Sequence, residues 1–234
     1  MKLLYEGKAK RLYETETAHE LLMEFKDDAT AFDGKKKAQF DNKGRLNKAL
    51  SSLLLQILEK EGEPTHFLRD QDETHTIAKD VEIIMVEVVV RNVATGSLCK
   101  RTWSKVGEPI VEYFLKDDAL GDPMISDEHV KLMNLATPGE LAHLRSEALR
   151  INATLKPLFE KADMTLIDFK LEFGRLAADP SKIILADEIT PDSRRLRDVK
   201  TGDKMDKDRF CRDLGDVMEN YAEVLKRAEH AADA

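Results

Sequence analysis

The sequence predicts an α+β fold in which a small, strand-rich N-terminal part meets a larger mixed part. Residues 2–25 group into short strands, and a β-branched run at 86–90 predicts a further strand. Leucine and isoleucine residues recur at helical spacing across 46–58 and predict a helix. We therefore expect two lobes, residues 1–84 and 85–234. Nothing in the composition marks a flexible linker between them.

The N-terminal elements follow in a simple order. The strands of the first lobe are followed by a polar, lysine-rich loop at 27–44 and then by the helix. Gly62 and Pro64 are typical of the point where a helix ends. Strand character returns over 75–90, where a single glutamate, Glu87, interrupts the β-branched run.

Two helices are expected in the C-terminal part. Thr137 is a good N-cap, Pro138 suits the first helical position, and Glu140 completes a capping box. A last helix is expected to begin at Asp206 or Asp208 and to run as one element through Leu225.

The strongest single feature is a pair of segments that read as a hairpin. Residues 166–174 read LIDFKLEFG, and in a strand every second side chain shares a face. Residues 182–189 form the second strand, joined to the first by the loop 175–181. The residues that share a face in these strands are Asp168, Lys170 and Glu172 in the first, and Ile183, Leu185 and Asp187 in the second.

Pairing these strands is expected to bring Asp168, Glu172 and Asp187 to one place near a lysine. Carboxylates aligned with large apolar residues are partly buried, and an unpaired buried charge is costly. A Mg²⁺ ion that also holds nucleotide phosphates would remove this cost. Surface charge alternation is common, so the pattern alone is equally compatible with a solvated charged hairpin.

Composition excludes several classes of protein. The chain has 234 residues and a net charge of −8, which argues against a nucleic-acid or anionic-membrane binder. No apolar run approaches the roughly 20 residues of a membrane span. Cys99 and Cys211 have neither disulfide nor metal-site spacing, and the six histidines are scattered. We therefore expect a cytoplasmic protein without a zinc site.

Lysines and arginines gather at three further positions. Lys8 and Lys10 are two residues apart beside a glycine, so they point the same way, and a polyphosphate between them would relieve their repulsion. The simpler alternative is a strand edge protected by lysines. Arg91 and Ser97 flank Gly96 after a strong strand, a combination suited to phosphate but also to an ordinary turn. Neither a Walker A sequence nor GxGxxG occurs.

Arg194 and Arg195 directly follow the turn TPDS that comes after Asp187. A second basic position so close to carboxylates predicts a divided pocket, with one part for metal and one for phosphate. The charged loop that contains Lys116 and Asp122 is uninformative by itself.

Taken together, six segments resemble one family, the SAICAR synthetases. They are GKAKRLYE, TAFDGKKK, VVVRNVATGS, LIDFKLEFG, ADEITPDSRRL and MDKDRF, in this order from Gly7 to Phe210. The resemblance implies a two-lobed, ATP-grasp-like fold with a small antiparallel N-terminal sheet. It also implies an ATP-dependent ligase of purine biosynthesis, which joins L-aspartate to carboxyaminoimidazole ribotide (CAIR) and releases ADP and phosphate.

The resemblance also implies roles for individual residues. It places four residues at the ATP phosphates, the last two also as Mg²⁺ ligands: Lys8, Lys10, Glu172 and Asp187. It places four at the reaction centre: Asp168, Lys170, Lys116 and Asp122. It places four on the ribotide: Arg91, Ser97, Asp192 and Arg195. The departures from the usual pattern spare all of these positions: Thr30, Lys48, Val93, Thr95 and Arg197.

The implied chemistry begins with phosphorylation of the ribotide carboxylate by ATP, after which the amine of aspartate displaces phosphate. The implied partners are therefore the small molecules ATP, CAIR and L-aspartate, and a homodimer is expected. Two other classes remain open from the residues: a kinase-like phosphotransferase, and a non-catalytic module that binds ATP.

Overall fold

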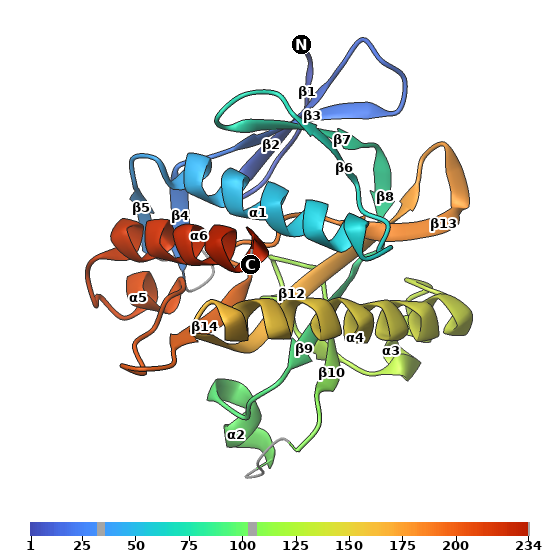
Figure 1. Cartoon of the computed structure of the whole chain (residues 1–234). Coiled ribbons are helices and arrows are strands. Elements are labelled where there is room, and N and C mark those ends of the chain that lie inside the picture. Colours follow the sequence, from blue (N-terminus) through green and yellow to red (C-terminus); the bar gives the residue numbers. More distant parts are fainter. Residues whose placement is uncertain (32–35, 103–106, 234) are drawn as a thin grey trace.

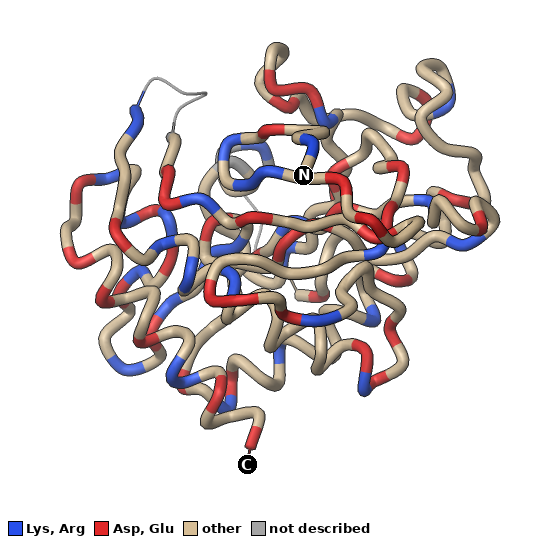
Figure 2. Tube along the Cα trace, turned by 90° about the horizontal axis from the view of Figure 1, so that it is seen from above, with Lys and Arg blue, Asp and Glu red and all other residues tan. Residues whose placement is uncertain are grey.

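The computed structural model describes residues 1–31, 36–102 and 107–233. It consists of two antiparallel sheets and a small two-stranded hairpin, with the long helices α1, α4 and α6 packed beside them (Figure 1). The expected α+β class is confirmed. Segments of lysine and arginine and segments of acidic residues are interspersed over the trace (Figure 2).

The N-terminal sheet has the order β1-β2-β3-β7-β6. Its strands all lie between residues 3 and 79: β1 Leu3–Glu6, β2 Lys10–Glu14, β3 Glu20–Phe25, β6 Phe67–Asp70 and β7 His75–Lys79. The predicted strands in residues 2–25 are confirmed. The lysine-rich segment differs from the expected loop, because it contains the hairpin of β4 (Asp28–Ala31) and β5 (Lys36–Gln39).

Helix α1, Lys43–Lys60, confirms the helix predicted from leucine spacing. Its apolar face is buried through Leu50, Leu54 and Leu58, each about 1% exposed or less. The chain leaves the helix at Gly62, whose φ of 88° is a conformation that glycine adopts without strain. The same helix also contacts α6, far along the chain (Figure 1).

The second sheet is organised around β12, Met164–Leu176, a strand of 13 residues. Antiparallel neighbours pair with different parts of it: β8 Val81–Ile83, β9 Val86–Arg91, β13 Asp179–Ala186 and β14 Arg194–Asp198. Strands β10 (Ile110–Leu115) and β11 (Met124–Ile125) extend the sheet beyond β9. The predicted hairpin is confirmed, although only residues 177–178 connect its strands, fewer than expected. The lobe boundary near residue 85 stays a prediction, and the chain changes sheets between β7 and β8.

The capping-box helix is α4, Pro138–Lys161, and its prediction is confirmed in detail. The Thr137 side chain accepts the N–H of Glu140, and the Glu140 carboxylate accepts the N–H of Thr137. Two short helices, α2 (Gly96–Thr102) and α3 (Asp127–Leu132), lie in segments for which no helix was expected.

The prediction of one final helix is wrong. Two helices are present, α5 (Asp208–Cys211) and α6 (Val217–Asp233). The backbone between them takes left-handed φ values at Asp213, Gly215 and Asp216, which end one helix before the next begins. Asp206 accepts the N–H of Asp208 and therefore belongs to the start of the short helix.

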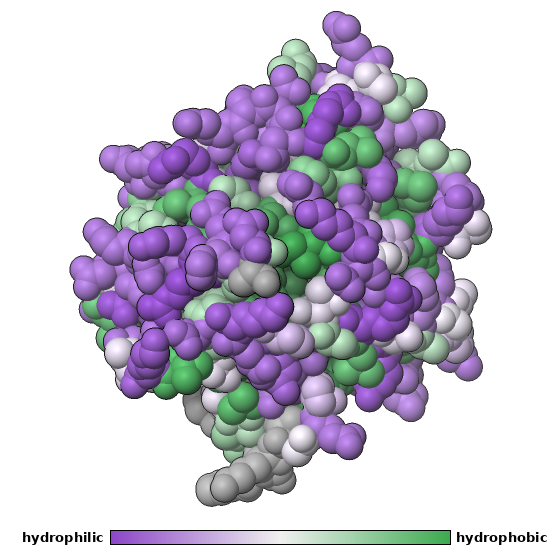
Figure 3. All heavy atoms as spheres, in the orientation of Figure 1, coloured by the Kyte–Doolittle hydropathy of each residue, from purple (hydrophilic) through white to green (hydrophobic). Residues whose placement is uncertain are grey.

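The main core lies where α1, α4 and α6 meet the second sheet, and it contains Val88, Leu155, Phe169 and Val224. The face seen in Figure 3 is mostly hydrophilic, with apolar atoms visible near its centre. Among the described residues, no helix is both long and apolar enough to cross a membrane.

Candidate active site

A cavity of about 520 Å³ lies where the N-terminal sheet meets β12 and β13. One part of its wall is apolar: Leu12, Leu21, Met23, Val81, Ile83 and Met85. Another part carries charged residues from both sheets: Lys8, Lys10, Lys116, Lys170, Glu172 and Asp187. This combination suits a ligand with a flat apolar group at one end and negative charge at the other.

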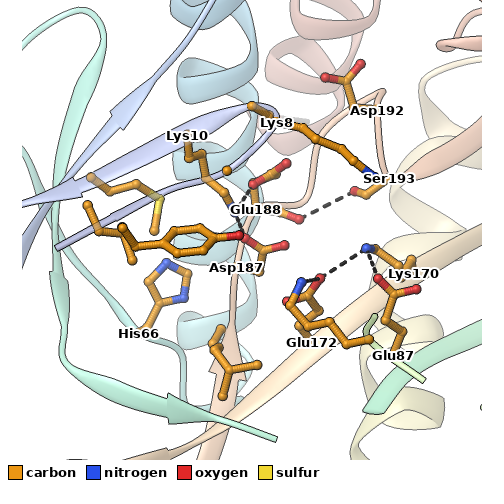
Figure 4. Close-up of a pocket in the computed structure, with 18 of the residues that line it drawn as sticks. Lys8, Lys10, His66, Glu87, Lys170, Glu172, Asp187, Glu188, Asp192 and Ser193 are labelled. Atoms are coloured by element: carbon orange, nitrogen blue, oxygen red, sulfur yellow. Dashed lines mark hydrogen bonds and ion pairs between the residues drawn. The ribbon is translucent and has the colours of Figure 1, made fainter. Parts of the chain in front are cut away.

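Lys8 and Lys10 both line this cavity, as their spacing predicts. They come from the turn between β1 and β2, where the N–H of Gly7 donates to the carbonyl of Lys10 at 2.9 Å. Lys8 is partly exposed and contacts Asp118 at 2.6 Å. Lys10 pairs with Asp187 and with the neighbouring Glu188 (Figure 4). The two ammonium groups therefore already rest on carboxylates across the cavity.

Glu172 is the most deeply buried acid of the first cavity, with 3% of the residue exposed. Burial opposes its charge, but Lys170, Lys116 and Lys10 outweigh burial and lower the pKa of Glu172 to about 2. The carboxylate accepts hydrogen bonds from Lys116 at 2.8 Å and from Lys170 at 3.0 Å. Glu172 therefore stays ionised at neutral pH.

Lys170 lies between two acids, because its ammonium also contacts Glu87 (Figure 4). Burial opposes its charge, yet Glu172 and Glu87 raise the pKa of Lys170 above its ordinary value. Burial raises the pKa of Glu87, an effect that Lys170 only partly offsets. The sequence reasoning did not count Glu87 as a site residue, although a lone charge in a β-branched run was a usable signal.

Asp187 lies just beyond β13, which ends at Ala186. The strand expected over 182–189 is therefore shorter, because Asp187 turns the chain with a φ of 66°. Since Ala186 is paired with Glu172, Asp187 still lies close to that acid along the hairpin. Both carboxylates line the first cavity.

A second cavity of about 360 Å³ lies beside the first. Its wall contains Arg91, Asp168 and Arg195. Asp168 accepts from Arg91 at 2.9 Å and from Arg195 at 2.8 Å. Arg91 also donates to Glu112 at 2.5 Å. These groups form one network of arginines and carboxylates, in which Arg91, Glu112 and Asp168 are buried and Arg195 is partly buried.

The predicted convergence of three carboxylates is not what the structure shows. Glu172 and Asp187 line the first cavity, while Asp168 lies four residues away along β12 and lines the second. Within the described ranges, no group of three or more histidine, cysteine or acidic side chains is placed to hold a metal ion. Two adjoining cavities are observed, whereas the predicted division into a metal part and a phosphate part stays a prediction.

Arg194 and Arg195 separate, because adjacent residues of β14 point to opposite sides. Arg195 faces Asp168, whereas the Arg194 guanidinium is buried over the ring of Phe159 in α4, 5.0 Å from its centroid. Burial lowers the pKa of Arg194 to about 9. Arg194 therefore packs into the core, although it also contributes to the wall of the second cavity, and a role for its charge in binding stays a prediction.

The remaining predicted residues are placed as follows. Asp122 lines the first cavity, and its carboxylate accepts the N–H of Asp117, which stabilises the loop that carries Lys116. Asp192 lines both cavities. Ser97 falls in α2, but its side chain lies outside the described part.

His66 was missed and lines the first cavity with its ring fully buried. Burial and the charge of Lys10 lower the pKa of His66 to about 4, so the ring is neutral at neutral pH. No sequence pattern distinguishes it from the other histidines.

Four residues belong to both cavities: Lys170, Asp192, Ser193 and Lys207. They form a shared wall between an acid- and lysine-lined space and an arginine-lined space. Groups bound in the two cavities would therefore both lie near these four residues.

Comparisons with known proteins agree with this arrangement. The family model described as SAICAR synthetase matches residues 3–228. A protein of Akkermansia muciniphila named phosphoribosylaminoimidazole-succinocarboxamide synthase is 52% identical and covers 99% of this chain and 100% of its own length. A protein of the same name from Nautilia profundicola is 51% identical, over 97% of this chain and 98% of its own.

Solved structures lead to the same family. The crystal structure of phosphoribosylaminoimidazole-succinocarboxamide synthase from Ehrlichia chaffeensis superposes with a TM-score of 0.94 at 40% identity, covering 97% of this chain and 98% of the other. A SAICAR synthetase in complex with ADP superposes with a TM-score of 0.92 at 43% identity, covering 97% of each chain. The chain belongs to the SAICAR synthetase family.

Proposed function

We propose that this protein joins L-aspartate to the carboxylate of carboxyaminoimidazole ribotide at the expense of ATP, giving SAICAR, ADP and phosphate. The observation that carries this proposal is the wall shared by the two cavities. A ligase of this type must bring a nucleotide phosphate to a carboxylate of a second substrate, and two adjoining cavities that each carry lysine or arginine side chains and share a wall would hold the two groups near each other.

In this proposal the first cavity binds ATP. Its apolar side takes the base, and Lys8 and Lys10 take the phosphates, for which they exchange their present carboxylate partners. The ADP complex of a relative at 43% identity supports this assignment. Lys116 and Lys170 neutralise further charge near the transferring phosphoryl group.

Glu172 and Asp187 are proposed to hold Mg²⁺. Mg²⁺ is commonly bound by one or two carboxylates together with substrate phosphates, and these two acids line the same cavity. When bound, the ion would offset negative charge on the phosphates. The proposal is supported by the lysines that contact both acids, since these carboxylates already stabilise positive charge.

The second cavity is proposed to bind the ribotide, with Arg91, Ser97 and Arg195 at its phosphate and Asp192 in the adjoining wall. Guanidinium groups suit phosphate because they offer paired donors in a fixed plane. Asp168 accepts hydrogen bonds from both arginines, which supports a role in holding them in place.

The chemistry then needs no nucleophile from the protein. An oxygen of the ribotide carboxylate takes the γ-phosphoryl group, ADP leaves, and an acyl phosphate forms. The aspartate amine attacks the carbonyl carbon, the C–O bond to phosphate breaks, and the amine loses a proton as the amide forms. Lys170, in the wall shared by both cavities, lies where the first transfer is proposed to occur.

The test is an assay of the purified protein with ATP, Mg²⁺, the ribotide and L-aspartate, with each component omitted in turn. We expect stoichiometric SAICAR, ADP and phosphate in the complete mixture only. Phosphorylated product without aspartate would instead support a kinase-like phosphotransferase. Binding of ATP with no ADP formed under any condition would support a non-catalytic module.

A homodimer and a cytoplasmic location are also part of this proposal. Light scattering of the purified chain tests the first: a mass near 53 kDa is expected for a dimer of the 26.5 kDa chain, and a mass near 26.5 kDa would contradict it.

A further inference from the structure

Asp192, in the wall between the cavities, is held by side chains from two helices. Its Oδ1 accepts the hydroxyl of Tyr221 in α6 at 2.7 Å. Its Oδ2 accepts from Lys43 at 2.5 Å and from Asn47 at 3.1 Å, both in α1. Both oxygens of this carboxylate therefore have partners within the protein.

The partners of Asp192 are themselves fixed in place. Lys43 and Tyr221 are each about 1% exposed. The backbone of Gly44, in the first turn of α1, packs directly against that of Phe25: a Cβ added to Gly44 would lie 2.3 Å from the Phe25 carbonyl oxygen. This close contact leaves the first turn little room to shift. The N–H of Gly44 also donates to Asp27 at 2.8 Å. Lys43 is thus a rigidly held buried cation facing Asp192.

The turn that carries Asp192 is connected to the proposed reaction centre. Asp192 donates its N–H to Thr190 Oγ1 at 3.2 Å, and Thr190 donates its own to Ser193 Oγ at 3.2 Å. The carbonyl of Ser193 then accepts the N–H of Lys170 in β12 at 2.8 Å. A displacement of Asp192 would therefore be transmitted through two residues to the backbone of Lys170.

The alternative role for Asp192 is direct binding of a ligand by its carboxylate. Burial opposes its charge, but Lys43 and Lys207 lower the pKa of Asp192 to about 2, so the group is ionised. Turning it towards a ligand would leave the buried Lys43 without a partner, which is strongly unfavourable. In Figure 4 the carboxylate is turned away from Lys170 and Glu172.

We propose that Asp192 is a positioning residue, and that the hydroxyl of Tyr221 in the C-terminal helix acts through it to set the turn at 190–193 and the backbone of Lys170. This inference rests on the proposed function, because its main readout is turnover. It extends the reaction centre to α6, a helix whose residues line neither cavity.

The test compares Tyr221→Phe with a matched control, Tyr13→Phe. Each change removes one phenol hydroxyl that donates to a carboxylate, since Tyr13 donates to Glu24 at 2.6 Å. Neither Tyr13 nor Glu24 lines a cavity. The enzyme is assayed with ATP, the ribotide and aspartate varied in turn, and ADP binding is measured by calorimetry.

For Y221F we expect kcat to fall about tenfold, the effect of losing one hydrogen bond to a charged group. The KM values and the ADP affinity should stay within about twofold, because no ligand contact is removed. Y13F should keep the wild-type kcat. A wild-type kcat in Y221F, or an equal loss in Y13F, would overturn the inference.

The variant Asp192→Asn completes the test. If Tyr221 acts through Asp192, the double variant Y221F/D192N should be no slower than D192N, because contacting residues in one network are not additive. Multiplying losses would show that Tyr221 acts by another route and would contradict the proposal. A KM for the ribotide raised tenfold in D192N at unchanged kcat would make Asp192 a ligand contact instead. Absence of SAICAR with the wild-type protein would refute the proposed function itself and is a separate outcome.

Discussion

The two cavities differ in the cations that line them and in how those cations are held. Every cation that lines the first cavity within the described residues is a lysine, and Lys8, Lys10, Lys116 and Lys170 all rest on carboxylates. The second cavity has Arg91 and Arg195 braced by Asp168. A lysine ammonium is a compact charge on a flexible stem, whereas a guanidinium has a fixed plane of donors. The first cavity can therefore change ion partners, and the second holds a fixed geometry.

The largest expected effect comes from Glu172→Gln, which tests the first cavity, where lysines pair with carboxylates. Removing one partner of a buried ion pair lowers the free energy of unfolding by about 3–5 kcal/mol. In this variant Lys116 and Lys170 would both lose a charged partner beside the proposed phosphate site. We expect kcat/KM to fall by more than about 100-fold, with normal circular dichroism. Wild-type Mg²⁺ dependence and turnover in E172Q would remove Glu172 from the site.

The free energy of unfolding at acidic pH should also depend on the Glu172 carboxylate. The folded pKa of Glu172 is about 2 and its ordinary value is 4.5. A lowered carboxylate pKa stabilises the fold above pH 4.5, and this contribution is lost as the pH falls towards 2, in all about 3 kcal/mol. Urea unfolding at several pH values measures it. The free energies of unfolding of wild type and E172Q should converge between pH 4.5 and 2, and parallel curves would contradict the assignment.

Arg195→Lys tests the second cavity, where the arginines are held in a fixed geometry by Asp168. Lysine keeps the charge but loses the fork that donates to Asp168, so we expect about 2 kcal/mol lost from ribotide binding, a KM roughly 30 times higher. The matched change in the first cavity is Lys8→Arg, which should leave the KM for ATP within about threefold. Equal effects of the two exchanges would remove the distinction between the cavities.

Lys8→Ala should give the smallest effect, because Lys8 is half exposed and its partner Asp118 more so. We expect about 1.5 kcal/mol lost from ATP binding, near a tenfold rise in KM for ATP, and a weaker dependence of that KM on salt. Titration at 0.05 and 0.5 M NaCl measures both. A KM for ATP that matches wild type at both concentrations would place Lys8 outside the phosphate site.

The sequence predicted those parts of the fold that depend on local patterns. The leucine spacing of α1, the capping box of α4 and the alternation in β12 were all sufficient. The break between α5 and α6 was missed because apolar spacing continues across Gly215, and left-handed backbone at Asp213 and Asp216 leaves no apolar signature.

The site was predicted less completely. Period-2 alternation placed Asp168 and Glu172 on one face, but it does not tell which other elements border each end of the strand and so divide the space into two cavities. The partners of Asp192 could not be predicted from local sequence patterns, since Lys43 and Tyr221 are 149 and 29 residues away from it in the sequence. Such contacts depend on tertiary packing.

The long strand β12 bears both Asp168 and Glu172, and pairing on both edges keeps its backbone extended. Four residues of extended chain span about 13 Å. The spacing between Asp168, which holds the two arginines, and Glu172 is thereby fixed by the covalent backbone. The β1–β2 turn has no such constraint, so we expect its lysines to adjust to a ligand more easily than β12 does.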